Sequence, residues 1–261
     1  MLTELKNEDL SAFAKDGYFV ARGFLSEHVR EALKSSIQGD LEPLVGPAEL
    51  EADVGYPGAP GHRSEVGGNT PRRLLHAYGR SDDLRSLALH EDVAHILSQL
   101  MGTDQVQLSQ CHHNCVMTKY PGFSSATLWH QDIRYWSFER PELISVWYAL
   151  GDELADNGAL SVIPGTHVEN FGRGRLDRNL FLRSELKENK TLTTQARVVE
   201  LTAGDALFFH CRLFHAAGRN LTGQVKISPV FTYHAQDNQP IPETSSDRLP
   251  SIILGNGAYI G

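Results

Sequence analysis

Residues 126–132 read Ala-Thr-Leu-Trp-His-Gln-Asp and place a histidine and a carboxylate at the end of a segment with extended character. Residues i and i+2 of a strand point to the same face, so His130 and Asp132 can bind one metal ion together. Two similar triplets are weaker candidates. Residues 90–92 (His-Glu-Asp) fall in a helical stretch, where i and i+2 lie about 200° apart. Residues 167–169 (His-Val-Glu) directly follow a Pro-Gly turn.

A second histidine ligand must come from a strand that returns beside His130. Residues 204–215, Gly-Asp-Ala-Leu-Phe-Phe-His-Cys-Arg-Leu-Phe-His, begin with a turn and continue as an apolar strand. They offer His210 and His215, and local spacing does not choose between the two. Two histidines and one carboxylate leave three positions open on a metal ion, which is the arrangement that non-heme Fe(II) oxygenases use to bind a cosubstrate and O2 together.

The overall composition is typical of a globular protein. The chain has 261 residues, of which 41% are hydrophobic, and its apolar stretches are too short to span a membrane. The polar, acidic N-terminus has no features of a signal peptide. A net charge of −8 without a basic run argues against a nucleic-acid partner, so a small-molecule substrate is expected. The cysteines Cys111, Cys115 and Cys211 favour a reducing, cytoplasmic setting over a disulfide framework. The oligomeric state is left open.

The chain is expected to form a single domain over residues 1–261. Residues 1–102 read as a mostly helical layer, residues 103–240 as a β core and residues 241–261 as a C-terminal tail. Helices are expected from Asn7 to Lys15, from an N-cap at Ser26 to about Ile37, and over residues 82–101, with a strand at 17–24 and a long loop at 43–72. Beyond residue 105, short β-branched and aromatic runs separated by glycine-containing turns predict a β-sandwich or a small barrel.

Several motifs share their order and spacing with one known family. They are Phe13-Ala-Lys-Asp-Gly-Tyr-Phe-Val, Trp129-His-Gln-Asp, Val146-Trp-Tyr-Ala-Leu, Asp156-Asn-Gly-Ala-Leu, Ile163-Pro-Gly-Thr-His, Gly204-Asp-Ala-Leu-Phe-Phe-His and His215-Ala-Ala-Gly-Arg-Asn. Together they resemble the phytanoyl-CoA dioxygenase family of Fe(II)- and 2-oxoglutarate-dependent oxygenases over most of the chain. The implied fold is mainly β with packed helices, a double-stranded β-helix (jelly roll, cupin-like). The resemblance assigns the distal metal ligand to His215 and makes His210 a neighbour.

The resemblance also implies residues that hold the cosubstrate, 2-oxoglutarate. The family commonly places an arginine for the far carboxylate a short distance after the distal histidine, and here that position is Lys226, a point charge rather than a bidentate fork. Ser228 lies two residues on, Lys119 resembles a second cosubstrate position, and Trp147 resembles an aromatic residue of the pocket wall. The alternatives are solvated lysines on strand edges and a tryptophan in the core. Arg219 is the substitute cation if Lys226 faces outward.

Substrate contacts are expected next to the metal motif. Arg134 and Tyr135 follow it directly, and His113 shares a strand face with Lys119 if that segment alternates with period 2. The loop at 43–72 could act as a lid, and the arginine-rich segment 170–190 reads as a solvated basic loop that could meet an anionic substrate.

The expected function is that of an Fe(II)- and 2-oxoglutarate-dependent dioxygenase, with O2 as the third participant. It would hydroxylate a small molecule at an unactivated C–H bond and release succinate and CO2. Asp132 favours hydroxylation or desaturation, because halogenases of related fold carry a small residue at that position. The alternative is a non-catalytic metal-binding jelly-roll sensor or scaffold, which Lys226 leaves open because a weakened cosubstrate site would disable turnover. A zinc hydrolase would need a general base near the metal, and no residue stands out for that role.

Overall fold

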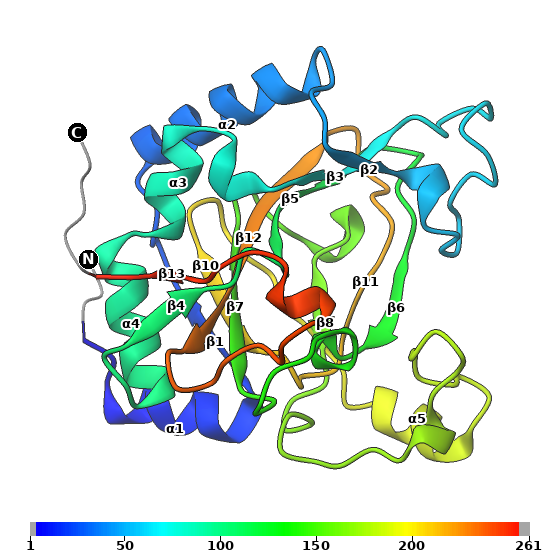
Figure 1. The fold of residues 1–261 in the computed structure, drawn as a ribbon. Coiled ribbons are helices and arrows are strands. Elements are labelled where there is room, and N and C mark those ends of the chain that lie inside the picture. The colour runs from blue at the N-terminus through cyan, green and yellow to red at the C-terminus, as the bar shows by residue number, and fades with distance from the viewer. Residues whose placement is uncertain (1–3, 256–261) are drawn as a thin grey trace.

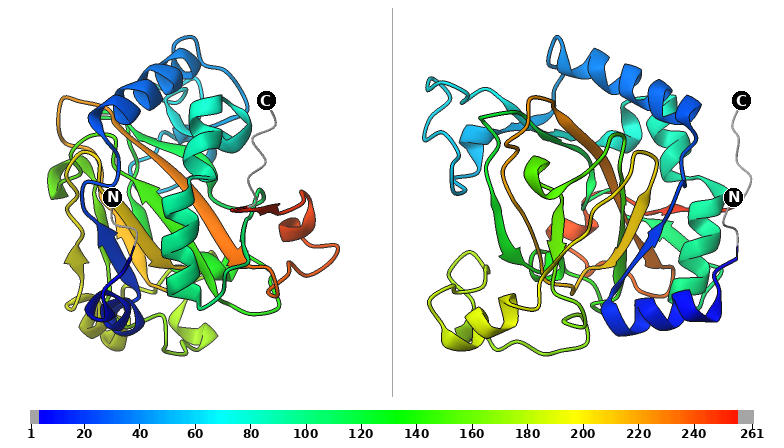
Figure 2. Two further views of the ribbon diagram at one scale, coloured as in Figure 1. Left: turned by 90° about the vertical axis from the view of Figure 1, so that its left-hand side faces the viewer. Right: turned by 180° about the vertical axis from the view of Figure 1, so that it is seen from behind.

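The computed structural model describes residues 4–255 as two facing β-sheets, with the helices that precede residue 102 packed against the outer side of the larger sheet (Figures 1 and 2). The helices are α1 (Asn7–Asp16), α2 (Glu27–Leu41), α3 (Asp82–Ala88), α4 (Glu91–Met101) and α5 (Lys187–Thr193). The major sheet has nine strands in the order β1-β10-β7-β12-β5-β3-β2, with β4 beside β12 and β13 beside β4. The minor sheet has four strands in the order β6-β11-β8-β9.

The strands of the major sheet are β1 (Tyr18–Ala21), β2 (Ala48–Leu50), β3 (Pro71–Leu75), β4 (Val106–Leu108), β5 (Asn114–Lys119), β7 (Leu143–Tyr148), β10 (Ala206–His210), β12 (Lys226–Ala235) and β13 (Ile252–Ile253). Those of the minor sheet are β6 (Thr127–His130), β8 (Leu160–Val162), β9 (Arg197–Val198) and β11 (His215–Ala217). Short 3-10 turns join several of them, including η1 (Glu51–Asp53), η3 (Asp132–Tyr135) and η4 (Ala155–Asn157).

The central strands are buried on both faces, and period-2 alternation divides their side chains between two cores. The outward set packs against the helices and includes Val146, Phe208 and Phe231. The inward set faces the minor sheet and includes Trp147 and Phe209. This division explains why the strand sequences are nearly continuous apolar runs rather than alternating polar and apolar residues. It also directs the few inward polar residues into the space between the two sheets.

The helical layer begins and ends largely where capping chemistry predicts. Ser26 caps α2, with its hydroxyl accepting a hydrogen bond from the Val29 N–H, and Gly102 ends α4 in the left-handed region at φ 67°. The expected helix over residues 82–101 is divided into α3 and α4, and His90 is the N-cap of α4 rather than an interior residue.

Residues before 103 contribute strands as well as helices. The predicted strand at residues 17–24 is found as β1, but the segment 43–72, expected to be one long loop, contains β2, η1 and the start of β3. Of the tail expected at 241–261, the part up to residue 255 includes β13, which joins the major sheet, and the remainder lies outside the described residues.

The predicted fold class, mainly β with packed helices in a jelly roll, is confirmed by these two antiparallel sheets. Within residues 4–255, none of the helices combines the length and apolar content that crossing a bilayer requires.

Candidate functional site

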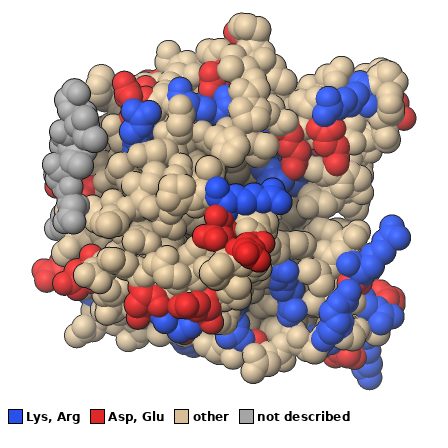
Figure 3. Space-filling model, viewed as in Figure 1, with Lys and Arg blue, Asp and Glu red and all other residues tan. Residues whose placement is uncertain are grey.

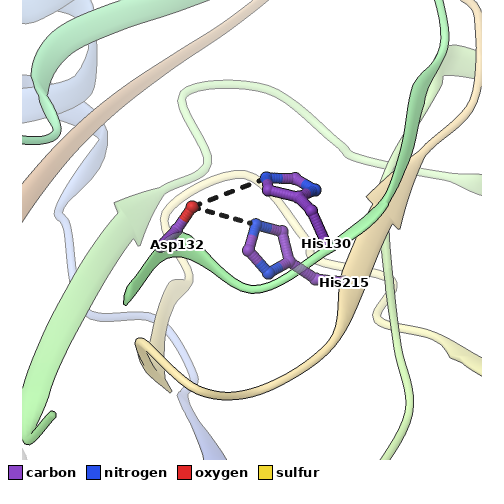
Figure 4. Close-up of side chains that lie close together, drawn as sticks. All are labelled: His130, Asp132 and His215. Atoms are coloured by element: carbon purple, nitrogen blue, oxygen red, sulfur yellow. Dashed lines mark ion pairs between the residues drawn. The ribbon is translucent and has the colours of Figure 1, made fainter. Parts of the chain in front are cut away.

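Strands β6 and β11 of the minor sheet bring the predicted metal ligands together. They pair antiparallel with the His215 Cα opposite the His130 Cα, and Asp132 follows in η3 directly after β6. Asp132 Oδ1 lies 3.5 Å from His130 Nε2 and 3.6 Å from His215 Nε2 (Figure 4). One ligand atom from each of the three residues lies within 4.8 Å of the ligand atoms of the other two, close enough for all three to bind one ion.

The backbone fixes which imidazole nitrogen is free in each histidine. His130 Nδ1 lies 2.8 Å from the Leu128 carbonyl, and His215 Nδ1 lies 3.0 Å from the Leu213 carbonyl. A carbonyl oxygen only accepts, so both Nδ1 atoms carry a proton, and the Nε2 atoms that face Asp132 are the nitrogens left for a metal. Two imidazole nitrogens and one carboxylate oxygen fit a divalent transition metal with open positions.

The second oxygen of Asp132 is held by His113. His113 Nε2 lies 3.0 Å from Asp132 Oδ2, which leaves Oδ1 for the metal position. Burial opposes ionisation of Asp132, but the imidazoles of His113 and His215 outweigh it and hold the pKa of Asp132 well below its ordinary value. Burial also disfavours the charged form of His113, yet Asp132 raises the pKa of His113 to about 10. Burial lowers the pKa of His215 to about 4, so this imidazole is neutral and able to bind a metal at neutral pH.

The competing histidines lie elsewhere. His210 ends β10, its Nδ1 accepts from the Arg212 N–H, and it packs on His167 with ring centroids 5.4 Å apart. His90 Nδ1 accepts a hydrogen bond from the Asp92 N–H at the start of α4. None of these side chains belongs to the metal-competent cluster found among the described residues.

A cavity of about 450 Å³ opens beside the triad, between the two sheets. The inward face of β5 forms one wall of the cavity, lined by Cys115, Met117 and Lys119. His113, directly before the strand, lines the cavity as well, as the shared face with Lys119 predicted. Trp147 and Lys226 line it as well. The volume lies in the range typical of small-molecule sites.

Two lysines face each other on neighbouring strands of this wall. Lys119 on β5 is directly opposite Lys226 on β12. The Lys119 ammonium donates to the carbonyls of Ser125 (2.9 Å) and Gly218 (2.6 Å). Burial, followed by repulsion from Lys226 and Arg72, lowers the pKa of Lys119 to about 7. Cations that converge in a buried wall favour an anionic ligand.

The Lys226 ammonium has a carboxylate partner that sequence reasoning missed. Its Nζ donates to Glu153 Oε2 at 2.9 Å and to Ser228 Oγ at 3.3 Å, and it lies 4.8 Å from the centroid of the Trp147 ring. Glu153 Oε1 accepts from Ser228 Oγ (2.6 Å) and from Trp147 Nε1 (2.9 Å). Lys226 lines the cavity, whereas Ser228 and Glu153 lie behind it. No local sequence signal marks Glu153, since its partner lies 73 positions away.

Arg72 is a second residue that sequence reasoning missed. It is buried, lines the cavity, donates to Thr127 Oγ1 at 3.2 Å and lies 4.7 Å from the Tyr56 ring centroid. Its Nε also lies 3.2 Å from Glu49 Oε1. Arg72 is the last residue of the segment 43–72 that was predicted to be a loop, where a solvated side chain is the ordinary expectation.

The predicted substrate contacts separate into two groups. His113 and Tyr135 line the cavity, and the Tyr135 hydroxyl donates to the Asn179 carbonyl at 2.6 Å. Arg134 is not among the lining residues, because its guanidinium turns to Gln131 Oε1 and to the Phe171 carbonyl. Arg219 donates to the Ser124 and Gly122 carbonyls outside the cavity.

Two lobes flank the site at the molecular surface. One contains η1 and the residues that lead to β3, and the other is the segment of residues 170–193, whose basic side chains are visible in Figure 3. The two lobes touch where the rings of Tyr56 and Phe181 meet edge to face, 5.6 Å apart. The space-filling view is notched between them.

Comparison with known proteins gives one family. The family described as phytanoyl-CoA dioxygenase matches residues 13–228. The curated relatives include the ectoine dioxygenase of Sphingopyxis alaskensis, 26% identical over 246 residues that cover 88% of this chain and 76% of the relative. The human peroxisomal phytanoyl-CoA dioxygenase is 33% identical over 102 residues, which cover 36% of this chain and 29% of that protein.

Solved structures with the same fold are similar over nearly the whole chain. A non-heme alpha-ketoglutarate-dependent carbocyclase from nogalamycin biosynthesis matches with a TM-score of 0.72 and 20% identity, covering 97% of each chain. EctD from S. alaskensis, crystallised with 2-oxoglutarate and 5-hydroxyectoine, matches with a TM-score of 0.71 and 22% identity, covering 91% of this chain and 78% of that one. At these identities the likeness establishes the fold.

Proposed function

The chain belongs to the phytanoyl-CoA dioxygenase family and is an iron- and 2-oxoglutarate-dependent dioxygenase, and from this premise we propose that it hydroxylates a small molecule at an unactivated C–H bond. Succinate and CO2 are the proposed co-products, and O2 is the oxidant. The proposed metal ligands are His130, Asp132 and His215.

One observation carries this proposal. Three donor atoms of the right kinds converge at the edge of a cavity whose wall also holds two buried lysines. A metal site alone would serve a sensor or a hydrolase equally well. Buried cations on the same wall favour an anionic second ligand beside the metal, and 2-oxoglutarate carries a carboxylate at each end.

The protein's part in the reaction is to bind and to orient. Iron, when bound, supplies the coupled oxidation of 2-oxoglutarate and activation of O2. His130 and His215 present their Nε2 atoms to the metal position, and their Nδ1–H bonds to backbone carbonyls fix both rings. His113 restrains the second oxygen of Asp132 and so favours one-oxygen ligation by that carboxylate. The remaining metal positions stay free for cosubstrate and oxidant.

The far carboxylate of 2-oxoglutarate is proposed to bind at the lysine wall. Lys119 and Lys226 supply the positive charge, and Trp147 supplies a flat apolar surface beside them. Arg72 and Thr127 are further candidates, because both line the same cavity. Ser228 contributes through Lys226 rather than by lining the cavity.

The substrate is proposed to enter on the side of the cavity lined by His113, Tyr135 and Tyr56. These side chains offer aromatic surface and a few hydrogen-bonding groups, as in sites for small polar molecules. Ectoine, which names several relatives, is the first compound to test. No contact seen in the described part of the chain specifies ectoine.

The test is the visible charge-transfer band that forms when 2-oxoglutarate chelates Fe(II). We expect the band when 2-oxoglutarate is added anaerobically to the Fe(II)-loaded protein, and we expect His215→Gln to abolish it. His210→Gln should keep it, because His210 faces away from the triad. A wild-type protein without the band would contradict the proposed function, and loss of the band in His210→Gln alone would reassign the distal ligand.

A second measurement identifies the substrate. Succinate release is measured aerobically with candidate small molecules, and the true substrate is expected to accelerate it over the uncoupled rate. A charge-transfer band without turnover for any compound would favour the non-catalytic sensor over the enzyme.

A further inference from the structure

Glu153 is a buried carboxylate that the proposed chemistry does not use directly. It stands between β7 and η4, and backbone hydrogen bonds in both directions with Leu201 fix its position. It is 1% exposed and accepts three side-chain hydrogen bonds, from Lys226, Ser228 and Trp147. Burying an ionised carboxylate this completely costs free energy unless it is paired with a cation, so we expect Glu153 to serve a function in this wall.

The surroundings of Lys226 explain what the carboxylate does. Like charges directly opposite on neighbouring strands repel, and Lys119 stands directly opposite Lys226. The charged groups that face this wall are Glu153, Lys119 on β5, Arg72 on β3 and Glu51 in η1. A buried lysine among cations loses its proton readily when no carboxylate accompanies it. Lys119, with carbonyl partners alone, illustrates this with its pKa of about 7.

The hydrogen bonds of Lys226 leave it able to bind a further anion. An ammonium has three N–H donors. Two of them are directed at Glu153 Oε2 and Ser228 Oγ, and the third has no hydrogen-bond acceptor among residues 4–255. Since Lys226 also lines the cavity, this third donor is available to a ligand there.

We propose that Glu153 is a positioning residue for the cosubstrate: it pairs with the Lys226 ammonium, offsets the repulsion from Lys119 and directs the ammonium so that Lys226 can bind the far carboxylate of 2-oxoglutarate. The proposal rests on the proposed function. Lysine has neither the planar fork nor the very high pKa of arginine, and Glu153, Ser228 and Trp147 supply the orientation and charge stabilisation that the lysine side chain lacks.

The test measures binding of 2-oxoglutarate to the Fe(II)-loaded protein by anaerobic calorimetry. Glu153→Gln keeps the shape of the side chain but removes the charge. We expect the Kd for 2-oxoglutarate to rise about tenfold or more, the effect expected when a hydrogen bond to a charged group is lost. In turnover the KM for 2-oxoglutarate should rise similarly with kcat nearly unchanged. Asp156→Asn is the matched control, since it removes an equal charge from the same segment at an exposed position.

A double-mutant cycle separates positioning from general damage. Lys226→Met should weaken binding by itself, and adding Glu153→Gln to it should weaken binding no further, because the carboxylate acts only through Lys226. If Glu153→Gln fails to fold, Glu153→Asp serves in its place and should raise the Kd by a smaller factor.

Three outcomes would overturn the inference. They are unchanged binding in Glu153→Gln, tighter binding in it, which would mean that Glu153 competes with the ligand for Lys226, and a full additional loss in the Lys226→Met background. Failure of the wild-type protein to bind 2-oxoglutarate at all would instead contradict the proposed function, so the two failures are distinguishable.

Discussion

Lys119 and Lys226 differ in their partners although they occupy equivalent positions on adjacent strands. Lys226 has a carboxylate, and Lys119 has two backbone carbonyls that stabilise its ammonium less. The consequence is a wall with one lysine that is paired with a carboxylate and another whose charge depends on pH near neutrality. A ligand carboxylate placed between the two ammonium groups would neutralise the positive charge that Glu153 offsets only in part.

The pKa of Lys119 predicts a pH dependence of cosubstrate binding. Below pH 7 the free protein carries the charged ammonium, so affinity is independent of pH through this group. Above pH 7 Lys119 is mostly neutral, and binding a carboxylate must take up a proton. Affinity for 2-oxoglutarate should therefore fall as pH rises from 7 to 9, by at most about tenfold per pH unit. Calorimetry across this range measures the slope.

Lys119→Met provides the control for this pH dependence. The variant should bind 2-oxoglutarate more weakly at pH 6.5 and lose the slope above pH 7 that Lys119 contributes. An identical slope in the variant and the wild type would show that another group titrates.

The metal ligands show how far residue-level reasoning reaches. His130 and Asp132 were predicted from i, i+2 geometry, although β6 ends at His130 and Asp132 begins a 3-10 turn. The choice of His215 over His210 came from family resemblance, and its structural reason is the register of β11 against β6. Glu153 could not be predicted, because its function depends on a partner far away in the sequence.

At the scale of elements, the turn between η4 and β8 controls the space around Lys119. Gly158 occupies it at φ +81°, and a Cβ there would lie 2.7 Å from the Gly218 carbonyl oxygen and 2.8 Å from Lys119 Cδ. Glycine is therefore required both for the left-handed backbone and for the close approach of two other segments.

Gly158→Ala is expected to lower the free energy of unfolding by about 1 to 3 kcal/mol, the range for backbone strain of this kind. Because Lys119 must also move, the Kd for 2-oxoglutarate should rise. Urea denaturation and calorimetry measure the two effects. Gly172→Ala, where a Cβ meets nothing within 4 Å, should change neither quantity. A Gly158→Ala protein that is destabilised but binds 2-oxoglutarate normally would show that the turn affects the stability of the fold but not the position of Lys119.

Elements were predictable where local chemistry marks their ends. The start of α2 was identified from a single residue, the N-cap Ser26. The break between α3 and α4 was missed, because the apolar spacing of residues 82–101 continues across it and His90 is an uncommon N-cap. The short strand β2 was missed because its pairing with β3 is set by tertiary contacts rather than by its own residues.

At the scale of the whole molecule, a bound metal would join residues from the two strands β6 and β11, whose His130 and His215 lie opposite each other, so metal binding should stabilise the folded state. At a free metal concentration about 100 times the Kd, the gain is about 2.7 kcal/mol. For a chain of this size that corresponds to a rise in Tm of about 5 to 10 °C. Anaerobic thermal unfolding with Fe(II), with and without a chelator, measures it.

Asp132→Asn should lose most of this metal-dependent rise in Tm, since it removes the charged ligand. His62→Gln, which changes an exposed histidine far from the triad in sequence, should retain it. A rise in Tm that persists in Asp132→Asn would place the stabilising ion elsewhere on the protein.

The general architecture followed from sequence more readily than its details. Turn-punctuated apolar runs after residue 105 predicted the β core, and resemblance supplied the jelly-roll topology. The expectation of a mostly helical N-terminal layer was incomplete, because β1 and β3 pair with strands from the rest of the chain, and β2 extends the sheet beyond β3. Such pairings join segments distant in sequence, and no local pattern encodes them.

The proposed binding groups for the two ends of the cosubstrate lie on different sheets. The metal ligands belong to or directly follow strands of the minor sheet, whereas Lys119 and Lys226 belong to the major sheet. The inward-facing core residues between the sheets therefore fix the span from metal to ammonium. Under the proposed function this distance would select the chain length of the dicarboxylate. Homologues of 2-oxoglutarate that are one carbon shorter or longer would fit the spacing between the two sheets less well.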